Sequence, residues 1–457
     1  MSPKALVIGL GASGRAAAQL LLAEGHDVIG FDSRAEAQPV PGLRACTLGG
    51  LTPPDAVYES IDLVLLSPGV PPAPHRAQAA RLAPNARITG ELDFALGVAR
   101  RRWPECPTVL ITGTNGKSTV TAMLGHVLTE TGRRPFVGGN LGVPLSAALL
   151  DDAAATPPDA LVLECSSYQL ETLSDHPVDV AMVLNVSPDH LDRYDDLAHY
   201  AATKGRIFRG LRDGGLALTY APDPRTRIGL PTVARYHQVV VDGPDAPRLH
   251  PDGHLEISDG WRVAREAVGL AGRHNAINAL FVARAAEQLG VARDACTAAL
   301  QRFRGLAHRM QYVASHEGIA YYDDSKATNV ASVVAMLDGF ERPVVLIAGG
   351  RAKRGDDLTP IADILRSQGR GLVALGEASD AMMAMAKGVV PTRAVVSMEA
   401  AVHAAREMAG PGDAVVLSPA CASWDMFDSF AHRGEVFCHS VRAMIGADTG
   451  TPSPDTT

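Results

Sequence analysis

Short apolar runs recur along the chain, separated by stretches with helical character. In the first hundred residues these runs lie at 5–9, 28–31, 63–66 and 87–89, and an alanine-rich helical segment covers Arg15 to Glu24. Continuous apolar runs of this length are typical of strands that are buried on both faces, and their alternation with helices favours a parallel sheet. The pattern therefore predicts an α/β domain that begins with a βαβ unit.

The same alternation appears in two further parts of the chain. The middle set of apolar runs is 108–112, 160–164 and 180–185, and the last set is 319–322, 344–348, 372–375 and 414–417. Between these two sets, the segment from about 214 to 268 is rich in Pro, Asp and Gly and has only short alternating runs. We expect this segment to form a small antiparallel appendage.

Two breaks in the pattern suggest domain boundaries. Proline and arginine dominate 100–107, where they disfavour helix continuation, and a Phe-Arg-Gly-Leu segment at 303–306 resembles a hinge. A chain of 457 residues is also long enough for about three domains. We predict a Rossmann-like domain at 1–103, a central P-loop-type ATPase domain with a mostly parallel sheet at 104–305, and a second Rossmann-like domain at 306–457.

Composition narrows the class of protein. The chain is 46% hydrophobic and 20% charged, its formal net charge is −8, and it has no basic stripe or Lys/Arg run of the kind that marks a nucleic-acid site, so we expect no nucleic-acid partner. No apolar run approaches the ~20 residues of a membrane-spanning helix, and the N-terminus lacks the regions of a signal peptide. Six scattered cysteines without a C-x-x-C spacing indicate neither a zinc site nor a disulfide framework. We therefore expect a cytoplasmic protein.

The strongest candidate for chemistry is the glycine-rich segment 113–118, Gly-Thr-Asn-Gly-Lys-Ser, between an apolar strand and a helix. Backbone N–H groups of such a turn cradle phosphates, a lysine reaches the β/γ oxygens and a hydroxyl reaches Mg²⁺. The segment departs from the general G-x-x-x-x-G-K-[ST] pattern because Ile111 stands at the first glycine position. A strand–turn–helix without a ligand is the alternative, and the pair Lys117-Ser118 favours phosphate binding.

Two other strands of the middle set end in polar residues. Glu164 ends one strand and is a candidate Mg²⁺ ligand, although from this segment alone an exposed strand-end acid is an equally good interpretation. Asp189 and His190 follow another strand, where the acid is a candidate acceptor for an ammonium group and the imidazole a candidate metal ligand. A single histidine is more often structural, but the carboxyl ends of parallel strands converge on one crevice.

The first glycine motif, Gly9-x-Gly11-x-x-Gly14 followed by Asp32, is typical by itself of a dinucleotide site. A uridine nucleotide uses the same physical features, because its pyrophosphate also binds at a helix N-terminus. The motif does not separate these ligands. The glycine-rich segment 113–118 with Lys117 favours an enzyme that uses a nucleoside triphosphate over an oxidoreductase.

Taken together, five segments resemble the signatures of the Mur ligase family, in the same order along essentially the whole chain. They are 113–119, 164–170, 185–193, 274–279 and 308–309. The resemblance implies an ATP-dependent ligase that phosphorylates a carboxylate and lets an amine displace phosphate from the acyl-phosphate. Folylpolyglutamate synthases share this scheme.

Further segments resemble the family members that add D-glutamate to UDP-N-acetylmuramoyl-L-alanine in peptidoglycan synthesis. These are 9–14, 66–69, 323–329 and 418–425. The Asn-Pro-Arg element typical of the diaminopimelate- or lysine-adding relatives does not occur. The resemblance therefore implies these two substrates, and we expect the protein to act as a monomer.

The resemblance also implies roles for individual residues. The catalytic residues would be Lys117, His190 and Lys204, and Mg²⁺, in two ions, would be held by Ser118, Glu164, His190 and Lys204. ATP would be contacted by Gly113, Thr114, Asn115, Gly116, Lys117, Ser118, Thr119, Asn275, Arg309 and Asp324. The two other substrates would be contacted by Ser13, Ser33, Arg34, Ser67, Asn140, Asp189, Lys326, Thr328, Lys353, Ser423 and Phe430.

Lys204 matches the lysine that this family carbamylates to make a metal ligand. Carbamylation requires a neutral amine, which burial near other cations favours by lowering the pKa. On sequence alone, a solvated helix lysine that pairs with Asp195 or Asp196 is the simpler interpretation. The sequence departs from the family at Gly205 and at Trp424, where larger and aliphatic residues are more usual.

Three alternatives stay open at this point. A folylpolyglutamate synthase would use the same chemistry on folate, a dinucleotide-dependent oxidoreductase would follow from the first glycine motif, and a non-catalytic nucleotide-binding regulator would keep the fold without the reaction. Lys117, Glu164 and His190 argue against the third.

Overall fold

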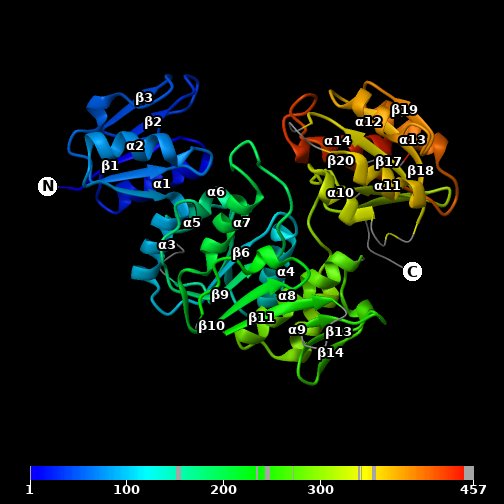
Figure 1. Cartoon of the computed structure of the whole chain (residues 1–457), viewed down its shortest axis with the longest axis horizontal. Coiled ribbons are helices and arrows are strands. Elements are labelled where there is room, and N and C mark those ends of the chain that lie inside the picture. Colours follow the sequence, from blue (N-terminus) through cyan, green and yellow to red (C-terminus); the bar gives the residue numbers. More distant parts are fainter. Residues whose placement is uncertain are drawn as a thin grey trace. The chain divides into compact units, whose positions relative to one another are not determined.

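The computed structural model describes residues 2–150, 156–232, 235–241, 247–270, 272–337, 340, 342–352 and 357–446 (Figure 1). The chain divides into two compact units, one made of Met1–Gly269 with Ile277–Phe303 and the other of Leu270–Ala276 with Arg304–Thr457. The first unit contains two sheets and the second unit contains one.

The first sheet, in blue in Figure 1, has five parallel strands in the order β3-β2-β1-β4-β5. Alternate residues of its central strand enter different cores, Ala5 and Val7 on one face and Leu6 and Ile8 on the other. The apolar run predicted at this point is therefore a strand buried on both faces. The elements are β1 (Lys4–Ile8), α1 (Ala12–Ala23), β2 (Asp27–Asp32), β3 (Ala45–Leu48), β4 (Leu63–Leu66), α2 (Pro72–Leu82), β5 (Arg87–Gly90) and α3 (Glu91–Arg102).

The second sheet has nine strands in the order β14-β13-β12-β11-β10-β9-β6-β8-β7. Its strands are β6 (Thr108–Thr112), β7 (Pro135–Gly139), β8 (Ala160–Glu164), β9 (Val178–Val183), β10 (Leu211–Tyr220), β11 (Arg235–Val241), β12 (Arg248–Leu249), β13 (Leu255–Ser258) and β14 (Trp261–Val263). Its helices are α4 (Lys117–Glu130), α5 (Leu145–Ala148), α6 (Ser167–Leu170), α7 (Leu197–Gly205), α8 (Arg273–Gln288) and α9 (Arg293–Arg302).

The prediction of an antiparallel appendage at 214–268 was wrong for much of that segment. Strands β10 and β11 pair in parallel with the main sheet, and so does β12, while only β13 and β14 are antiparallel. A register shift between Leu211 and Leu216 interrupts β10 at its two glycines. Because the glycines at this break are typical of loops, the sequence did not indicate that β10 is a long strand.

The sheet of the second unit has the strand order β15-β16-β20-β17-β18-β19, and only the β15–β16 pair is antiparallel. Alternate residues of β17 again enter two cores. The elements are β15 (Gln311–His316), β16 (Ile319–Asp323), α10 (Val330–Leu337), β17 (Val344–Gly349), α11 (Thr359–Gln368), β18 (Gly369–Leu375), α12 (Ser379–Ala386), β19 (Thr392–Ala394), α13 (Met398–Met408), β20 (Ala414–Ala420) and α14 (Phe430–Met444).

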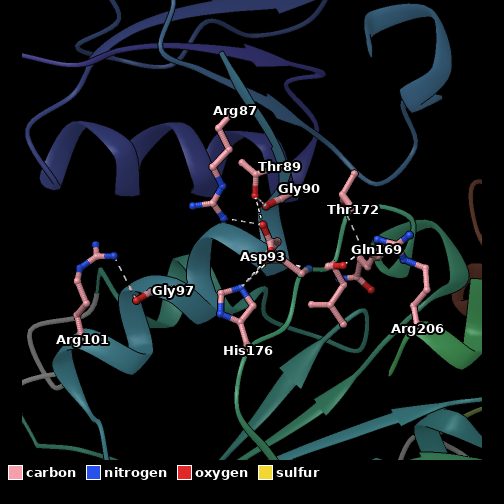
Figure 2. Close-up of polar contacts among 12 residues, drawn as sticks. Arg87, Thr89, Gly90, Asp93, Gly97, Arg101, Gln169, Thr172, His176 and Arg206 are labelled. Carbon is pink, nitrogen blue, oxygen red and sulfur yellow. Dashed lines mark hydrogen bonds and ion pairs between the residues drawn. The ribbon is translucent and has the colours of Figure 1, made fainter. Parts of the chain in front are cut away.

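The first two sheets meet at a polar seam on α3. Figure 2 shows the Asp93 carboxylate between β5 and the segment before β9. It accepts from Arg87 Nη2 at 2.9 Å and from the Thr89 hydroxyl at 2.5 Å, both on β5, and it lies 2.7 Å from Nε2 of His176. The backbone N–H of Ser174 adds a bond of 2.9 Å. Burial would raise the pKa of Asp93, but the bonds from His176, Ser174 and Thr89 outweigh it and hold that pKa well below its usual value. The seam fixes the end of β5 against the loop after α6.

The six cysteines, all of which lie in the described ranges, are free thiols. Among the described residues, no helix is long and apolar enough to cross a membrane.

Candidate active site

A glycine-rich turn joins β6 to α4, as the sequence predicted. Gly116 has φ = 82°, in the left-handed region that favours glycine, and a Cβ there would lie 3.0 Å from Oδ1 of Asn278. The turn is held to the end of β9 by Asn185. Its Oδ1 accepts from the N–H of Asn115 at 2.9 Å, its Nδ2 donates to the Asn115 carbonyl at 3.1 Å, and its own carbonyl accepts from the N–H of Thr114 at 3.0 Å. The turn is thus preorganised by protein groups before any ligand binds.

Two lysine ammonium groups meet at this turn. Lys117 Nζ donates to the carbonyls of Gly113 and Thr114, both at 2.8 Å, and Lys204 Nζ donates to the same Gly113 carbonyl at 2.9 Å. Lys204 comes from α7, is 1% exposed and lies 4.4 Å from the centre of the Tyr200 ring. The interpretation of Lys204 as a solvated helix lysine is therefore wrong.

The surroundings of Lys204 disfavour its charged form. Burial is the main cause that lowers the pKa of its amine well below the ordinary value, and the nearby charge of Lys117 lowers it further. A larger fraction of the amine is therefore neutral near pH 7 than in a solvated lysine. Neutral amines are the form that reacts with CO₂.

Glu164 ends β8 beside the turn and is 2% exposed. Its Oε1 accepts from Nδ2 of Asn140 at 2.7 Å, while its buried Oε2 has no hydrogen-bond partner. A buried carboxylate oxygen without a partner is costly, and a divalent cation satisfies it directly. Glu164 and the hydroxyl of the buried Ser118 are oxygen donors of the type that Mg²⁺ prefers, so the residues present fit this ion.

His190 follows β9 in a strained conformation, with φ = 55°. Its Nδ1 lies 2.9 Å from the Tyr168 hydroxyl, and its Nε2 lies 3.6 Å from Oδ2 of Asp189. The Asp189 carboxylate also accepts from the N–H of His190 at 3.0 Å. The strained histidine is thus fixed from both sides, as expected for a side chain with a positional role.

Among the described residues, no group of three or more His, Cys, Asp and Glu could hold a metal. The predicted ligands Ser118, Glu164, His190 and Lys204 include only two residues of these types. The residues predicted at the three strand ends do belong to one compact unit of the protein.

The glycine turn of the first sheet is built differently. A Cβ on Gly14 would lie 1.8 Å from the Gly9 carbonyl oxygen, so α1 approaches β1 more closely than any side chain allows. The buried Asp32 accepts from the N–H of Leu10 at 2.6 Å and forms a two-pronged ion pair with Arg34, which lowers its pKa to about 2. Both oxygens of the acid that would bind a ribose in a dinucleotide site are therefore occupied by protein donors.

The other residues predicted to bind the nucleotide surround this turn. Ser13 and Ser67 are half-buried, and Ser33 and Arg34 are exposed. Ser67 lies against Gly9, where a Cβ would approach the serine Cβ to 2.8 Å. The same unit has a small cleft lined by Leu66, Ser67, Pro68, Val70, Gly90, Glu91, Tyr168, Gln169, Glu171 and Thr172.

The second unit has its own buried acid, Asp324. Burial raises its pKa to about 7, although the Ser418 hydroxyl, which donates to its Oδ2 at 2.8 Å, and the charge of Arg309 act in the opposite direction. Asn275, in the first turn of α8, is also buried. Asp324, Asn275 and Arg309 all belong to the second unit, and their contact with ATP stays a prediction.

Lys326 and Phe430 lie together in the second unit, with the lysine Nζ 3.8 Å from the centre of the ring. Ser423 is buried and Thr328 is half-buried. Trp424 is 64% exposed, so it does not fill a core position. Lys353 lies outside the described residues.

Comparison with known proteins decides the family. Models of the Mur ligase middle domain and of the Mur ligase glutamate ligase domain match residues 111–286 and 308–421. UDP-N-acetylmuramoylalanine–D-glutamate ligase of Pelotomaculum thermopropionicum is 38% identical over 96% of this chain and 98% of its own length. The enzyme of the same name from Myxococcus xanthus is 40% identical, over 96% of this chain and 98% of its own length. The chain belongs to the Mur ligase family.

Solved Mur ligases share the fold. UDP-N-acetylmuramate-alanine ligase MurC from Thermotoga maritima matches with a TM-score of 0.60 at 18% identity, over 97% of this chain and 100% of its own. MurF ligase from Thermotoga maritima, solved in complex with ADP, matches with a TM-score of 0.61 at 16% identity, over 98% of this chain and 96% of its own. The predicted α/β fold with mostly parallel sheets is confirmed.

Sequence reasoning missed several residues of this Mur ligase site. Tyr200 lies four residues before Lys204, and helical spacing alone places the two on one face of α7. Tyr168 and Asn185 lie inside the recognised segments, but nothing in their spacing indicates that one contacts His190 and the other holds the phosphate turn. These contacts depend on long-range pairing of strands.

Proposed function

We propose that this chain is a UDP-N-acetylmuramoylalanine–D-glutamate ligase that forms ADP. It activates the alanine carboxylate of UDP-N-acetylmuramoyl-L-alanine as an acyl-phosphate, which the amine of D-glutamate attacks. The observation that carries the proposal is the meeting of the Lys117 and Lys204 ammonium groups at one glycine turn, next to the strand that ends at the buried Glu164. This arrangement occurs in a chain that is 38% identical over nearly its full length to enzymes of that name.

The phosphates of ATP would bind the backbone of 113–119, where Lys117 would exchange its two carbonyl partners for phosphate oxygens. A lysine at this place offsets negative charge that develops on the transferred phosphoryl group. Bound Mg²⁺ supplies the same kind of charge stabilisation and orients the phosphates. One ion would be held by Ser118 and Glu164, and a second by His190 and a carbamylated Lys204.

The carbamate proposal rests on the burial of Lys204. A carbamylated lysine replaces a buried amine by an anionic pair of oxygens, which suits a cation better than the amine does. The Tyr200 ring and the Gly113 carbonyl already fix the direction of the side chain. His190, held by Tyr168 and Asp189, would keep its ring oriented toward the same ion.

The uridine nucleotide would bind the first glycine turn. Ser13, Ser33 and Ser67 offer hydroxyl donors to the pyrophosphate and uracil, and Arg34 offers a guanidinium whose direction is set by Asp32. Asn140, which donates to Glu164, would lie near the carboxylate end of the substrate. D-Glutamate would be recognised in the second unit through the side chains Lys326, Thr328, Lys353, Ser423 and Phe430.

These assignments correspond to three domains, 1–103 for the nucleotide, 104–305 for ATP and 306–457 for the amino acid. The three sheets fall within these ranges. Asn275, Arg309 and Asp324 would contribute further ATP contacts.

The test measures the release of phosphate from ATP, with Mg²⁺ present, for each acceptor combined with each glutamate enantiomer. We expect release that requires both UDP-N-acetylmuramoyl-L-alanine and D-glutamate, with formation of the amide product. Release with dihydrofolate or tetrahydrofolate and L-glutamate would instead indicate a folylpolyglutamate synthase. Hydride transfer with NAD and no ATP turnover would contradict the proposal altogether.

A further inference from the structure

Arg193 forms a two-pronged ion pair that the proposed reaction leaves unexplained. Its Nε and Nη2 donate to the two carboxylate oxygens of Glu171 at 3.1 and 2.6 Å. The side chains are only 15% and 11% exposed, so the pair is largely removed from water. An ion pair that is removed from water is costly to form and depends strongly on geometry. It therefore indicates a specific role for these two side chains.

The same guanidinium also reaches the first sheet. Nη2 of Arg193 donates to the backbone carbonyl of Val70 at 3.2 Å. Val70 closes a turn on Ser67, whose carbonyl accepts from the N–H of Val70 at 2.9 Å, and the N–H of Ser67 is held by β1 at 2.9 Å. Arg193 therefore contacts the turn that carries a proposed nucleotide-binding serine.

On its other side, Arg193 belongs to the loop of His190. Its backbone N–H donates to the His190 carbonyl at 2.9 Å and closes the strained turn there. Its guanidinium carbon lies 5.0 Å from the centre of the Tyr168 ring, and the hydroxyl of that ring lies 2.9 Å from Nδ1 of His190. One side chain thus contacts both the support of His190 and the turn of Ser67.

The cleft in this unit lies at the same junction. Ser67 and Val70 line one part of it, and Tyr168 and Glu171 line another. Arg76 adds a second tie across the junction, because it donates to the Glu171 carbonyl at 3.2 Å. The neighbouring Thr172 packs against the end of β5, because a Cβ on Gly90 would lie 2.2 Å from the Thr172 hydroxyl oxygen (Figure 2).

We propose that Arg193, held by Glu171, is a positioning residue that sets the distance between the Ser67–Val70 turn and His190. It thereby aligns the carboxylate of the nucleotide substrate with the phosphate turn. The inference rests on the proposed function, because it assigns the nucleotide to the Ser67 turn and the reacting carboxylate to the neighbourhood of His190. Arginine suits this place because its planar guanidinium binds both oxygens of Glu171 through two N–H groups while it contacts the Val70 carbonyl, and the ammonium of a lysine lacks this planar fork.

The test compares steady-state kinetics of Arg193→Ala, Arg193→Lys and Glu171→Gln with those of the wild type. We expect the KM for UDP-N-acetylmuramoyl-L-alanine to rise about tenfold or more in Arg193→Ala and kcat to fall about 10- to 100-fold, because small misplacements of a reacting group are costly. The KM for ATP should change less than twofold. Arg193→Lys should recover only part of the loss. The double variant Arg193→Ala/Glu171→Gln should lose little more than Arg193→Ala alone, because the two residues act as a unit.

Arg248→Ala is the matched control. Arg248 also donates through Nε and Nη2 to a carboxylate, that of Glu256, in the same unit, and the side chains are 19% and 15% exposed. It lies on β12 of the second sheet, whereas the Ser67 turn follows β4 of the first sheet. We expect Arg248→Ala to lower the thermal midpoint of unfolding while leaving both KM values unchanged.

Chemical rescue separates positioning from folding. Millimolar guanidinium or methylguanidinium should restore part of the kcat of Arg193→Ala, and it should not raise the kcat of the wild type or of Arg248→Ala. If Arg193→Ala does not fold, Glu171→Gln, which keeps the size of the side chain, supplies the same kinetic comparison.

The outcomes are distinct. If the wild type forms no amide with this nucleotide, the proposed function fails and the inference falls with it. If the wild type is active but both KM for the nucleotide and kcat are unchanged in Arg193→Ala and Glu171→Gln, the inference alone is overturned. It is also overturned if the KM for ATP rises in parallel, or if Arg248→Ala shows the same kinetic loss.

Discussion

The protein uses a glycine-rich strand–turn–helix junction twice, at β1–α1 and at β6–α4, and the two are equipped differently. The first has no lysine in the turn, and its buried acid, Asp32, is already paired with Arg34. The second has two lysine amines on one turn and, beside it, a buried carboxylate oxygen of Glu164 without a partner. One backbone geometry is thus suited to an anion in both places, and under our proposal the side chains around it decide whether the site only binds or also does chemistry.

The two turns differ in whether the protein itself compensates the buried charged groups beside them. Around the first turn, the charge of Asp32 is compensated within the protein, so the proposed pyrophosphate would meet hydroxyls and backbone dipoles. Around the second turn, a buried amine and a buried carboxylate are kept in states that a nucleotide and a divalent cation would stabilise. Such groups are costly for the folded protein, and they cluster where function needs them.

The largest expected effect is at the lysine of the second turn. Lys117→Ala should lower kcat by about 10³-fold, because it removes a charge placed at the transferring phosphoryl group. Phosphate release with both substrates present is the measurement. The exposed Lys387→Ala in the second unit is the control and should keep full activity. Near-wild-type turnover in Lys117→Ala would remove the distinction between the two turns.

Glu164→Gln should lower kcat by about 100-fold and raise the Mg²⁺ concentration needed for half-maximal activity. The one oxygen of glutamine keeps the bond from Asn140, so an amide NH₂ group replaces the unpartnered Oε2 and removes both the charge and the oxygen that a cation would bind. Titration of activity with Mg²⁺ measures both effects. An unchanged Mg²⁺ dependence would mean that the unpartnered oxygen of Glu164 has no part in binding a cation.

A smaller effect, confined to the nucleotide, is expected at the first turn. Asp32→Asn should raise the KM for UDP-N-acetylmuramoyl-L-alanine about tenfold, since it releases Arg34 from its fixed direction and costs about 1–2 kcal/mol of binding. The KM for ATP should stay the same. Asp27→Asn breaks a more exposed pair with Arg44 in the same sheet and serves as the control. An equal rise of both KM values would argue against separate sites.

The last expected effect is on stability rather than on kinetics, and it comes from the buried amine of Lys204. Because its pKa is lowered in the folded state, the unfolded chain binds more protons below the ordinary value of 10.5. The stability of the wild type should therefore rise with pH in that window relative to Lys204→Met, by at most about 1.4 kcal/mol per pH unit.

Urea denaturation of both proteins between pH 7 and 9.5, in buffers free of CO₂, measures this difference. Parallel curves would show that the amine of Lys204 titrates normally.

The sequence predicted the central strands well because they are buried on both faces and form continuous apolar runs. It did not reveal β3, β7, β15 and β19, which are short or partly exposed and show no comparable pattern. The two glycines that interrupt β10 made a strand of the main sheet resemble a loop. Local composition was a poor guide wherever pairing with a distant strand decided the structure.

For the site, the sequence provided the residues at the strand ends but not their partners. Spacing placed Lys117 and Ser118 at a helix start and Glu164 at a strand end, and the structure agrees. That Lys204 is buried, that Tyr168 supports His190 and that Arg193 reaches Val70 are consequences of tertiary packing. No periodicity in the chain reports them.

The central claim is that ATP bound at the β6–α4 turn phosphorylates the carboxylate of the uridine nucleotide bound at the β1–α1 turn. The most direct test uses UDP-N-acetylmuramoyl-L-alanine with ¹⁸O in both carboxylate oxygens, ATP and D-glutamate, and determines the isotope content of the released phosphate by mass spectrometry. An acyl-phosphate leaves one carboxylate oxygen on the phosphate when the amine displaces it. We predict one ¹⁸O atom in each phosphate released per amide formed; amide formation with unlabelled phosphate would contradict the account.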